Sequence, residues 1–178
     1  MKRFTKYHKY GAYHWKWYNN PERYGRYKDH VDKIIKWIKE KNILDVGCGD
    51  GLITFLLNAK GIDNESQAIK VGKRRGANIE LGDAYNIQYP DEEFDVVFMG
   101  DVLEHLEFPE KALKEMRRVL KKYLYISIPI EKKIIDPFHY EKWTADKLRK
   151  MVESIGFVLI EEMEPENYTK LYAKFKKI

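Results

Sequence analysis

Three glycines stand at every second position behind a short apolar run, in "ILDVGCGDG" at residues 43–51. The run predicts a buried strand, and glycine permits positive φ and lets a ligand approach the bare backbone. A glycine-rich turn between a parallel strand and a helix is typical of a nucleotide-type site. Because Asp45 and Asp50 flank the glycines, the surroundings suit a cation better than a pyrophosphate.

The spacing of the glycines limits the kind of ligand. A dinucleotide turn needs G-x-G-x-x-G. Gly47 and Gly49 fit that pattern, but its third position is Leu52, and the third glycine is instead Gly51. No G-K-[ST] follows to make a phosphate-binding P-loop. The pattern therefore favours a ligand without a phosphate group.

Apolar periodicity predicts strands that alternate with helices, which gives a mostly parallel sheet covered by helices on both faces. Seven strands are expected, over 42–46, 60–63, 78–81, 94–99, 123–130, 157–163 and 170–178. Helices are expected over 21–40, 51–59, 65–76, 109–122 and 144–156. Asn20 and Thr144 are predicted N-caps. Leu52, Phe55 and Leu56 are expected to face inward, and the last strand is expected to run antiparallel.

Four motifs in order resemble those of the class I S-adenosylmethionine (SAM)-dependent methyltransferases. They are "LDVGCGDG" at 44–51, "GID" at 61–63, "GDA" at 82–84 and "FDVVFMGDVLEHL" at 94–106. The resemblance runs from about residue 21 to the end of the chain. It implies a Rossmann-like fold, SAM as cofactor with S-adenosylhomocysteine as product, and methyl transfer as activity.

The resemblance also implies which residues bind the cofactor: Asp45, Gly47, Cys48, Gly49, Gly51, Asp63, Asn64, Asp83, Ala84, Met99 and Gly100. Asp63 would accept from the two ribose hydroxyls, with the N-cap of the following helix as the alternative. Asp83 would accept from the adenine amine, or else close a local turn. The carbonyls of Met99 and Gly100 would receive the ammonium group. Cys48 is expected to be a small structural residue, with a reactive thiol as the alternative.

Candidate acid–base residues follow the fourth and fifth strands. Asp101 and His105 come after the fourth, and His139 lies in the loop after the fifth. Each histidine is a candidate base or acceptor contact, or a packing residue. No [DNS]-P-P-[YFW] stretch of the amine-directed nucleic-acid enzymes is present, and the sole cysteine stands in the cofactor turn. No metal site is predicted.

The N-terminal segment combines positive charge with aromatic residues. Residues 1–28 hold eight Lys and Arg and one acid. We expect a single domain over 1–178, with an aromatic and basic cap at 1–20 and a core at 21–178. Tyr13, Trp17 and Tyr18 are candidate acceptor contacts, because aromatic rings stack flat substrates or bases. Packing of the cap onto the core is the alternative.

The acceptor class stays open at the level of sequence. A small molecule methylated at an O or N atom is the leading expectation. An RNA or protein acceptor gripped by the basic segment is one alternative, and a non-catalytic SAM-binding subunit is another. With one cysteine, no apolar signal segment and no run long enough to cross a bilayer, a cytoplasmic protein is expected. The oligomeric state is not predicted.

Overall fold

The computed structural model describes residues 6–130, 139–140, 142–164 and 170–178. These residues form two compact units, of which the first ends at Asp83 and the second begins at Ala84. Residues 1–5 of the predicted cap lie outside the described part of the chain. No helix in the described ranges is long and apolar enough to cross a membrane.

The first unit is built on three parallel strands, β1 (Ile43–Val46), β2 (Lys60–Asp63) and β3 (Ile79–Leu81). All four residues of β1 are buried, as the apolar run predicts. Two helices follow the strands in the order expected of βαβ units, α4 (Leu52–Leu56) and α5 (Ser66–Lys73). The carboxyl ends of β1 and β2 therefore lie side by side, with Asp45 paired to Gly61.

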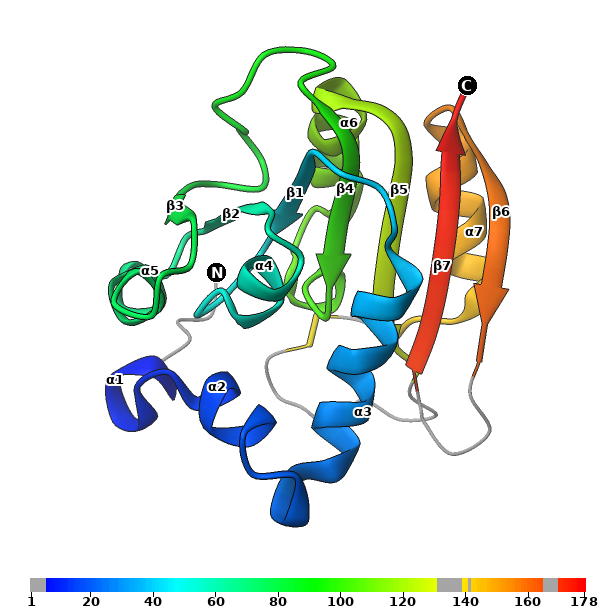
Figure 1. The fold of residues 1–178 in the computed structure, drawn as a ribbon. Coiled ribbons are helices and arrows are strands. Elements are labelled where there is room, and N and C mark those ends of the chain that lie inside the picture. The colour runs from blue at the N-terminus through cyan, green and yellow to red at the C-terminus, as the bar shows by residue number, and fades with distance from the viewer. Residues whose placement is uncertain (1–5, 131–138, 141, 165–169) are drawn as a thin grey trace. The chain divides into compact units, whose positions relative to one another are not determined.

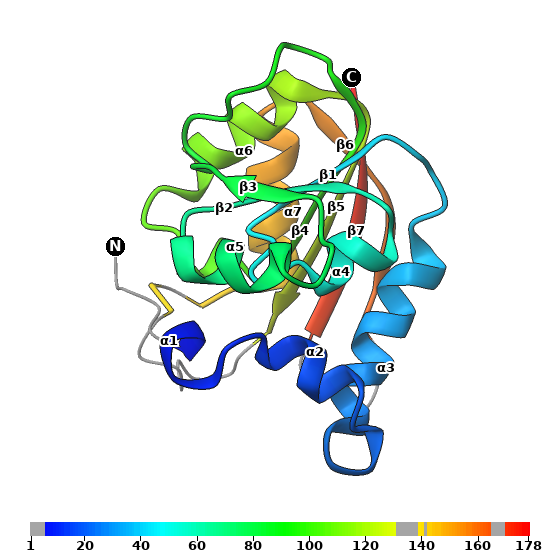
Figure 2. The same ribbon diagram turned by 60° about the vertical axis from the view of Figure 1, so that its left-hand side comes forward.

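Three further helices precede the strands of the first unit. They are α1 (Lys6–Tyr10), α2 (Tyr13–Tyr18) and α3 (Pro21–Trp37). Asn20 caps α3 as predicted, since its side chain accepts from the Arg23 amide, and Pro21 occupies the first turn. Both ribbon views show α1 and α2 on the same side of α4 and α5 (Figures 1 and 2). In the described residues, the segment predicted to form the cap is therefore helical.

The second unit holds four strands, β4 (Phe94–Gly100), β5 (Leu120–Pro129), β6 (Phe157–Met163) and β7 (Lys170–Lys177). β4 and β5 are parallel, whereas β7 runs antiparallel to both β5 and β6 and lies between them (Figure 1). The helical segments are η1 (Leu103–His105), a single 3₁₀ turn, α6 (Pro109–Val119) and α7 (Ala145–Ser154). The last strand is antiparallel, as expected.

Two local expectations need correction. Phe55 was expected to face inward, but it is 47% exposed and packs at the edge of Trp15, with ring centroids 5.1 Å apart. The buried residues of this short helix are Leu52, as expected, and Thr54, which bonds a buried carboxylate. The helix predicted to reach residue 122 stops at Val119, and β5 begins at Leu120, because Leu120 is buried and pairs with Phe94 of β4.

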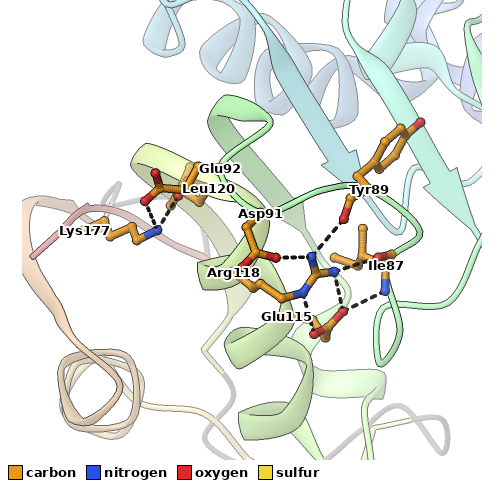
Figure 3. A network of polar contacts seen from close by, with 8 residues as sticks. All are labelled: Ile87, Tyr89, Asp91, Glu92, Glu115, Arg118, Leu120 and Lys177. Atoms are coloured by element: carbon orange, nitrogen blue, oxygen red, sulfur yellow. Dashed lines mark hydrogen bonds and ion pairs between the residues drawn. The ribbon is translucent and has the colours of Figure 1, made fainter.

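The connection from Ala84 to β4 is fastened by the guanidinium of Arg118 on α6 (Figure 3). It donates to the carbonyls of Ile87 and Tyr89 and to the carboxylates of Asp91 and Glu115. These five bonds of 2.7–3.0 Å use every N–H that arginine offers. The two carboxylates raise the pKa of Arg118. A loop without regular structure is therefore held in one conformation.

Candidate cofactor and acceptor sites

The glycine turn after β1 adopts the backbone conformation that its sequence predicts. Gly47, Gly49 and Gly51 have φ of 80°, 55° and 71°, which L side chains rarely adopt. The amides of Gly47 and Cys48 both donate to the carbonyl of Ile62, at 2.8 and 3.0 Å. The turn after β1 is thereby tied to the neighbouring strand β2.

Asp63, at the end of β2, binds the same turn through its side chain. Its carboxylate accepts from the Gly49 amide and from the Glu65 amide, each at 2.8 Å. Burial raises the pKa of Asp63. The N-cap of α5 is Glu65, whose side chain accepts from the Gln67 amide, so Asp63 does not fill the capping role considered from the sequence. The role of Asp63 toward ribose stays a prediction.

Asp45 is buried in the first unit, and Cys48 is half-buried there. Thr54 donates to the Asp45 carboxyl at 2.6 Å, and burial raises the pKa of Asp45 to about 7. Burial likewise raises the pKa of the Cys48 thiol well above its ordinary value. A thiol that keeps its proton is a poor nucleophile. This supports the structural interpretation of Cys48.

Asp50, inside the glycine turn, is the anchor of the N-terminal helices. Its carboxylate accepts from the His14 amide and lies 3.1 Å from His14 Nδ1, while its carbonyl accepts from Trp15 Nε1 at 2.9 Å. Asp50 is fully buried. The sequence indicates this acid only as part of the electrostatic surroundings of the glycines. The sequence feature that could have indicated the partners of Asp50 is the high density of aromatic residues and histidine before α3.

The aromatic residues of α1 and α2 pack on one another and on the first unit. Tyr7, Tyr13, His14 and Trp17 form a cluster of rings with centroids 4.1–6.0 Å apart. The Tyr7 hydroxyl lies so close to Gly49 that a Cβ there would stand 2.3 Å from it. The glycine turn is therefore covered by the Tyr7 ring in this structure.

The three predicted acceptor contacts take part in this packing. Tyr13 is buried, and burial raises its pKa to about 12. Trp17 is half-buried and stacks on Tyr24, and the Tyr18 hydroxyl donates to Asp32 on α3. The arrangement favours the packing alternative for these side chains. A role toward the acceptor stays a prediction for each of them.

The remaining predicted cofactor residues belong to several elements. Asn64 and Asp83 are exposed in the first unit, and Ala84 is half-buried at the start of the second. Met99 is buried in β4, and Gly100 ends that strand. A Cβ at Gly100 would stand 2.5 Å from the Phe98 ring, so glycine is required there by packing.

The candidate acid–base residues all lie in the second unit. Asp101 has φ of 55° and forms an ion pair with Lys170 on β7. His105 ends η1, and its ring meets that of His139 edge to face, with centroids 4.9 Å apart. The structure therefore brings the two histidines together, although they are distant in the sequence.

Comparison with known proteins places the chain in a class. Residues 44–126 match the methyltransferase domain family, a range that includes the glycine turn, Asp63 and both Met99 and Gly100. Together with the fold described above, this match supports a class I SAM-dependent methyltransferase. SAM is accordingly its cofactor.

The proteins that match this chain include one sequence relative and two solved structures that share its fold. An uncharacterised protein of Methanocaldococcus jannaschii is 28% identical over 164 residues, which cover 84% of this chain and 79% of that protein. A possible histamine N-methyltransferase of Thermotoga maritima aligns with TM-score 0.75 and 18% identity over 91% of this chain and 98% of its own. Magnesium protoporphyrin IX methyltransferase of Synechocystis, solved with S-adenosylhomocysteine, aligns with TM-score 0.75 and 14% identity over 97% of each chain.

The named methyltransferases found by sequence are longer than this chain. The chain spans less than half the length of each of them. The solved structures confirm the Rossmann-like fold class. The acceptor has to be argued from this chain's own residues.

Proposed function

We propose that the chain transfers the methyl group of SAM to an O or N atom of a small-molecule acceptor. The observation that carries this proposal is the position of the Asp63 carboxylate, between the glycine turn and the end of β2. A carboxylate offers about four acceptor positions. Two bonds to backbone amides leave room for both hydroxyls of a ribose, so the residues present fit the cofactor.

The work left to the protein is positioning. When bound, SAM supplies a methyl group on a sulfonium, so the leaving group needs no further activation. Gly47 and Gly49 present backbone without a side chain, and Asp63 orients the sugar. Asp83 and Ala84 are proposed to fix the adenine. If the acceptor must lose a proton, His105 or His139 is proposed to take it.

A small-molecule acceptor is favoured by the packing of the N-terminal helices. The rings that could have stacked bases are engaged with one another, which removes one support for RNA binding. Lys6, Lys9 and Lys16 remain exposed, so an RNA or protein acceptor held by charge is the second candidate. A SAM-binding subunit without its own activity is the third.

The cofactor site is tested with Asp63→Ala. We expect this variant to bind S-adenosylhomocysteine about tenfold more weakly or worse in calorimetry, from the lost ribose bonds. The matched control is Glu65→Ala, which removes the neighbouring carboxylate that caps α5. That control should lower the melting temperature and leave affinity unchanged. Equal affinity of Asp63→Ala and wild type would contradict the proposal.

The acceptor class is tested by labelling a fractionated extract with tritiated SAM. Label in a low-molecular-weight fraction is expected. Loss of label after nuclease or protease treatment would mean that the acceptor is RNA or protein and not a small molecule. A steep fall of labelling with rising salt would indicate contacts to phosphate groups. The absence of any transfer by the isolated chain would support the non-catalytic alternative.

A further inference from the structure

Three potential metal ligands meet in the second unit. Glu104 and His105 are neighbours on η1, and His139 follows β5 at a long distance in the sequence. One ligand atom from each residue lies within 4.8 Å of the other two. His105 Nε2 is 4.0 Å from Glu104 Oε1. The sequence alone predicts no metal site.

The backbone holds these three side chains together. The Tyr140 amide donates to the Glu104 carbonyl at 2.9 Å, which fixes the segment of His139 against η1. The two imidazole rings meet edge to face. Glu104 is 2% exposed, so its carboxylate is shielded from bulk water. Electrostatic interactions are stronger in such a shielded place than in water. The two histidines are only half-buried, which leaves the cluster open to an incoming ion.

We propose that Glu104, His105 and His139 bind one divalent first-row transition-metal ion of the zinc type. Two imidazoles and one carboxylate are a donor set that suits Zn²⁺ or Co²⁺ rather than Mg²⁺, which prefers oxygen ligands. Neighbouring ligand atoms in a tetrahedral zinc site stand about 3.4 Å apart, given bonds of about 2.0–2.1 Å. Side-chain rotations that move each atom by about 1 Å therefore close the site.

A bound ion would change the chemical role of the two histidines. A nitrogen that coordinates a metal no longer accepts a proton. Three protein ligands leave a coordination position open for water or another oxygen. In so far as the proposed methyl transfer holds, the acceptor hydroxyl would bind at that position. Because the ion lowers its pKa, that hydroxyl would release its proton to water more readily.

The test is metal binding by the full chain, without SAM or acceptor, so that its outcome is independent of the proposed methyl transfer. The purified protein is treated with chelator and titrated with Co²⁺. One Co²⁺ per chain is expected, with visible absorption that Zn²⁺ abolishes. His105→Ala and His139→Asn should each weaken binding about tenfold or more, with circular dichroism unchanged. Glu104→Gln should weaken it too.

The matched control is His8→Ala. His8 Nε2 lies 3.7 Å from Glu65 Oε1, a similar histidine–carboxylate pair, and among the described residues this pair gains no third ligand. That variant should bind Co²⁺ as the wild type does. The proposal is overturned if His105→Ala and His139→Asn retain wild-type affinity, if binding is not stoichiometric, or if Mg²⁺ binds more tightly than Zn²⁺.

Discussion

The protonation of Asp45 makes the stability of the first unit depend on pH. Burial raises its pKa in the folded protein to about 7, from an ordinary value near 4. Folded protein keeps this proton while unfolded protein releases it. The protonated Asp45 carboxyl therefore contributes fully to the stability of the folded protein below about pH 4. This contribution is lost as the pH rises through about 7.

Asp45→Asn should remove this loss, because an amide keeps the acceptor for Thr54 and carries no charge. Relative to wild type, the variant should gain about 2 kcal/mol between pH 5 and pH 8, measured by urea unfolding without cofactor. Asp146→Asn, at a side chain that is 75% exposed, is the control and should change little with pH. A pH-independent effect of Asp45→Asn would mean that the carboxyl is already ionised at pH 5.

Gly49→Ala should be strongly destabilising for two separable reasons. Alanine is strained at φ of 55°, and its Cβ would collide with the Tyr7 hydroxyl. Gly11→Ala is the matched control, because Gly11 has φ of 64° but nothing within 4 Å of an added Cβ. We expect Gly49→Ala to lower the melting temperature more than Gly11→Ala does.

The added Tyr7→Phe substitution should recover part of that difference, since it removes the colliding oxygen. If Gly49→Ala and Gly11→Ala are equally destabilised, the Tyr7 ring does not cover the turn in solution.

Single residues were predicted from the sequence where the requirement is local. Positive φ at Gly47, Gly49 and Gly51 follows from the residue type and the motif. The capping bond of Thr144 follows from its place before a helix. The bond between Asp50 and His14 could not be predicted, because both residues have ordinary local interpretations and only folding brings them together.

At the scale of elements, Arg118 joins α6 to the segment before β4 (Figure 3). Arg118→Lys should destabilise the protein by about 1–2 kcal/mol, because one ammonium cannot serve five acceptors on four residues. The melting temperature should fall by about 2–8 °C. Arg149→Lys is the control, since its Nη2 donates to the single carboxylate of Glu162. Equal effects of the two substitutions would show that the loop needs no such anchor.

Element types were predicted better than element ends. The hydrophobic repeats of 109–119 and 145–154 indicated helices that the structure contains. Phe55 was misplaced because α4 has only five residues, too few for its periodicity to define an inward face. The contact between η1 and His139 could not be predicted, because local sequence patterns do not show which distant segments of the chain lie close together.

For the whole molecule, cofactor binding should be visible as thermal stabilisation. S-adenosylhomocysteine at about 100 times its Kd should add about 2.7 kcal/mol, which raises the melting temperature by about 5–11 °C. NAD at the same concentration should give no shift, because the third glycine stands at 51 and not at 52. Stabilisation by NAD alone would contradict the assignment of the glycine turn to SAM.

The anchoring of the N-terminal helices on Asp50 also bears on how the chain is made. His14 and Trp15 are added by the ribosome 36 and 35 residues before the acid that binds them. At roughly 5–20 residues per second, that partner is added about 2–7 s later. During this interval the aromatic side chains of the nascent segment cannot pack on the glycine turn, which has not yet been synthesised. The chain is therefore most open to association with other chains before Asp50 has been added.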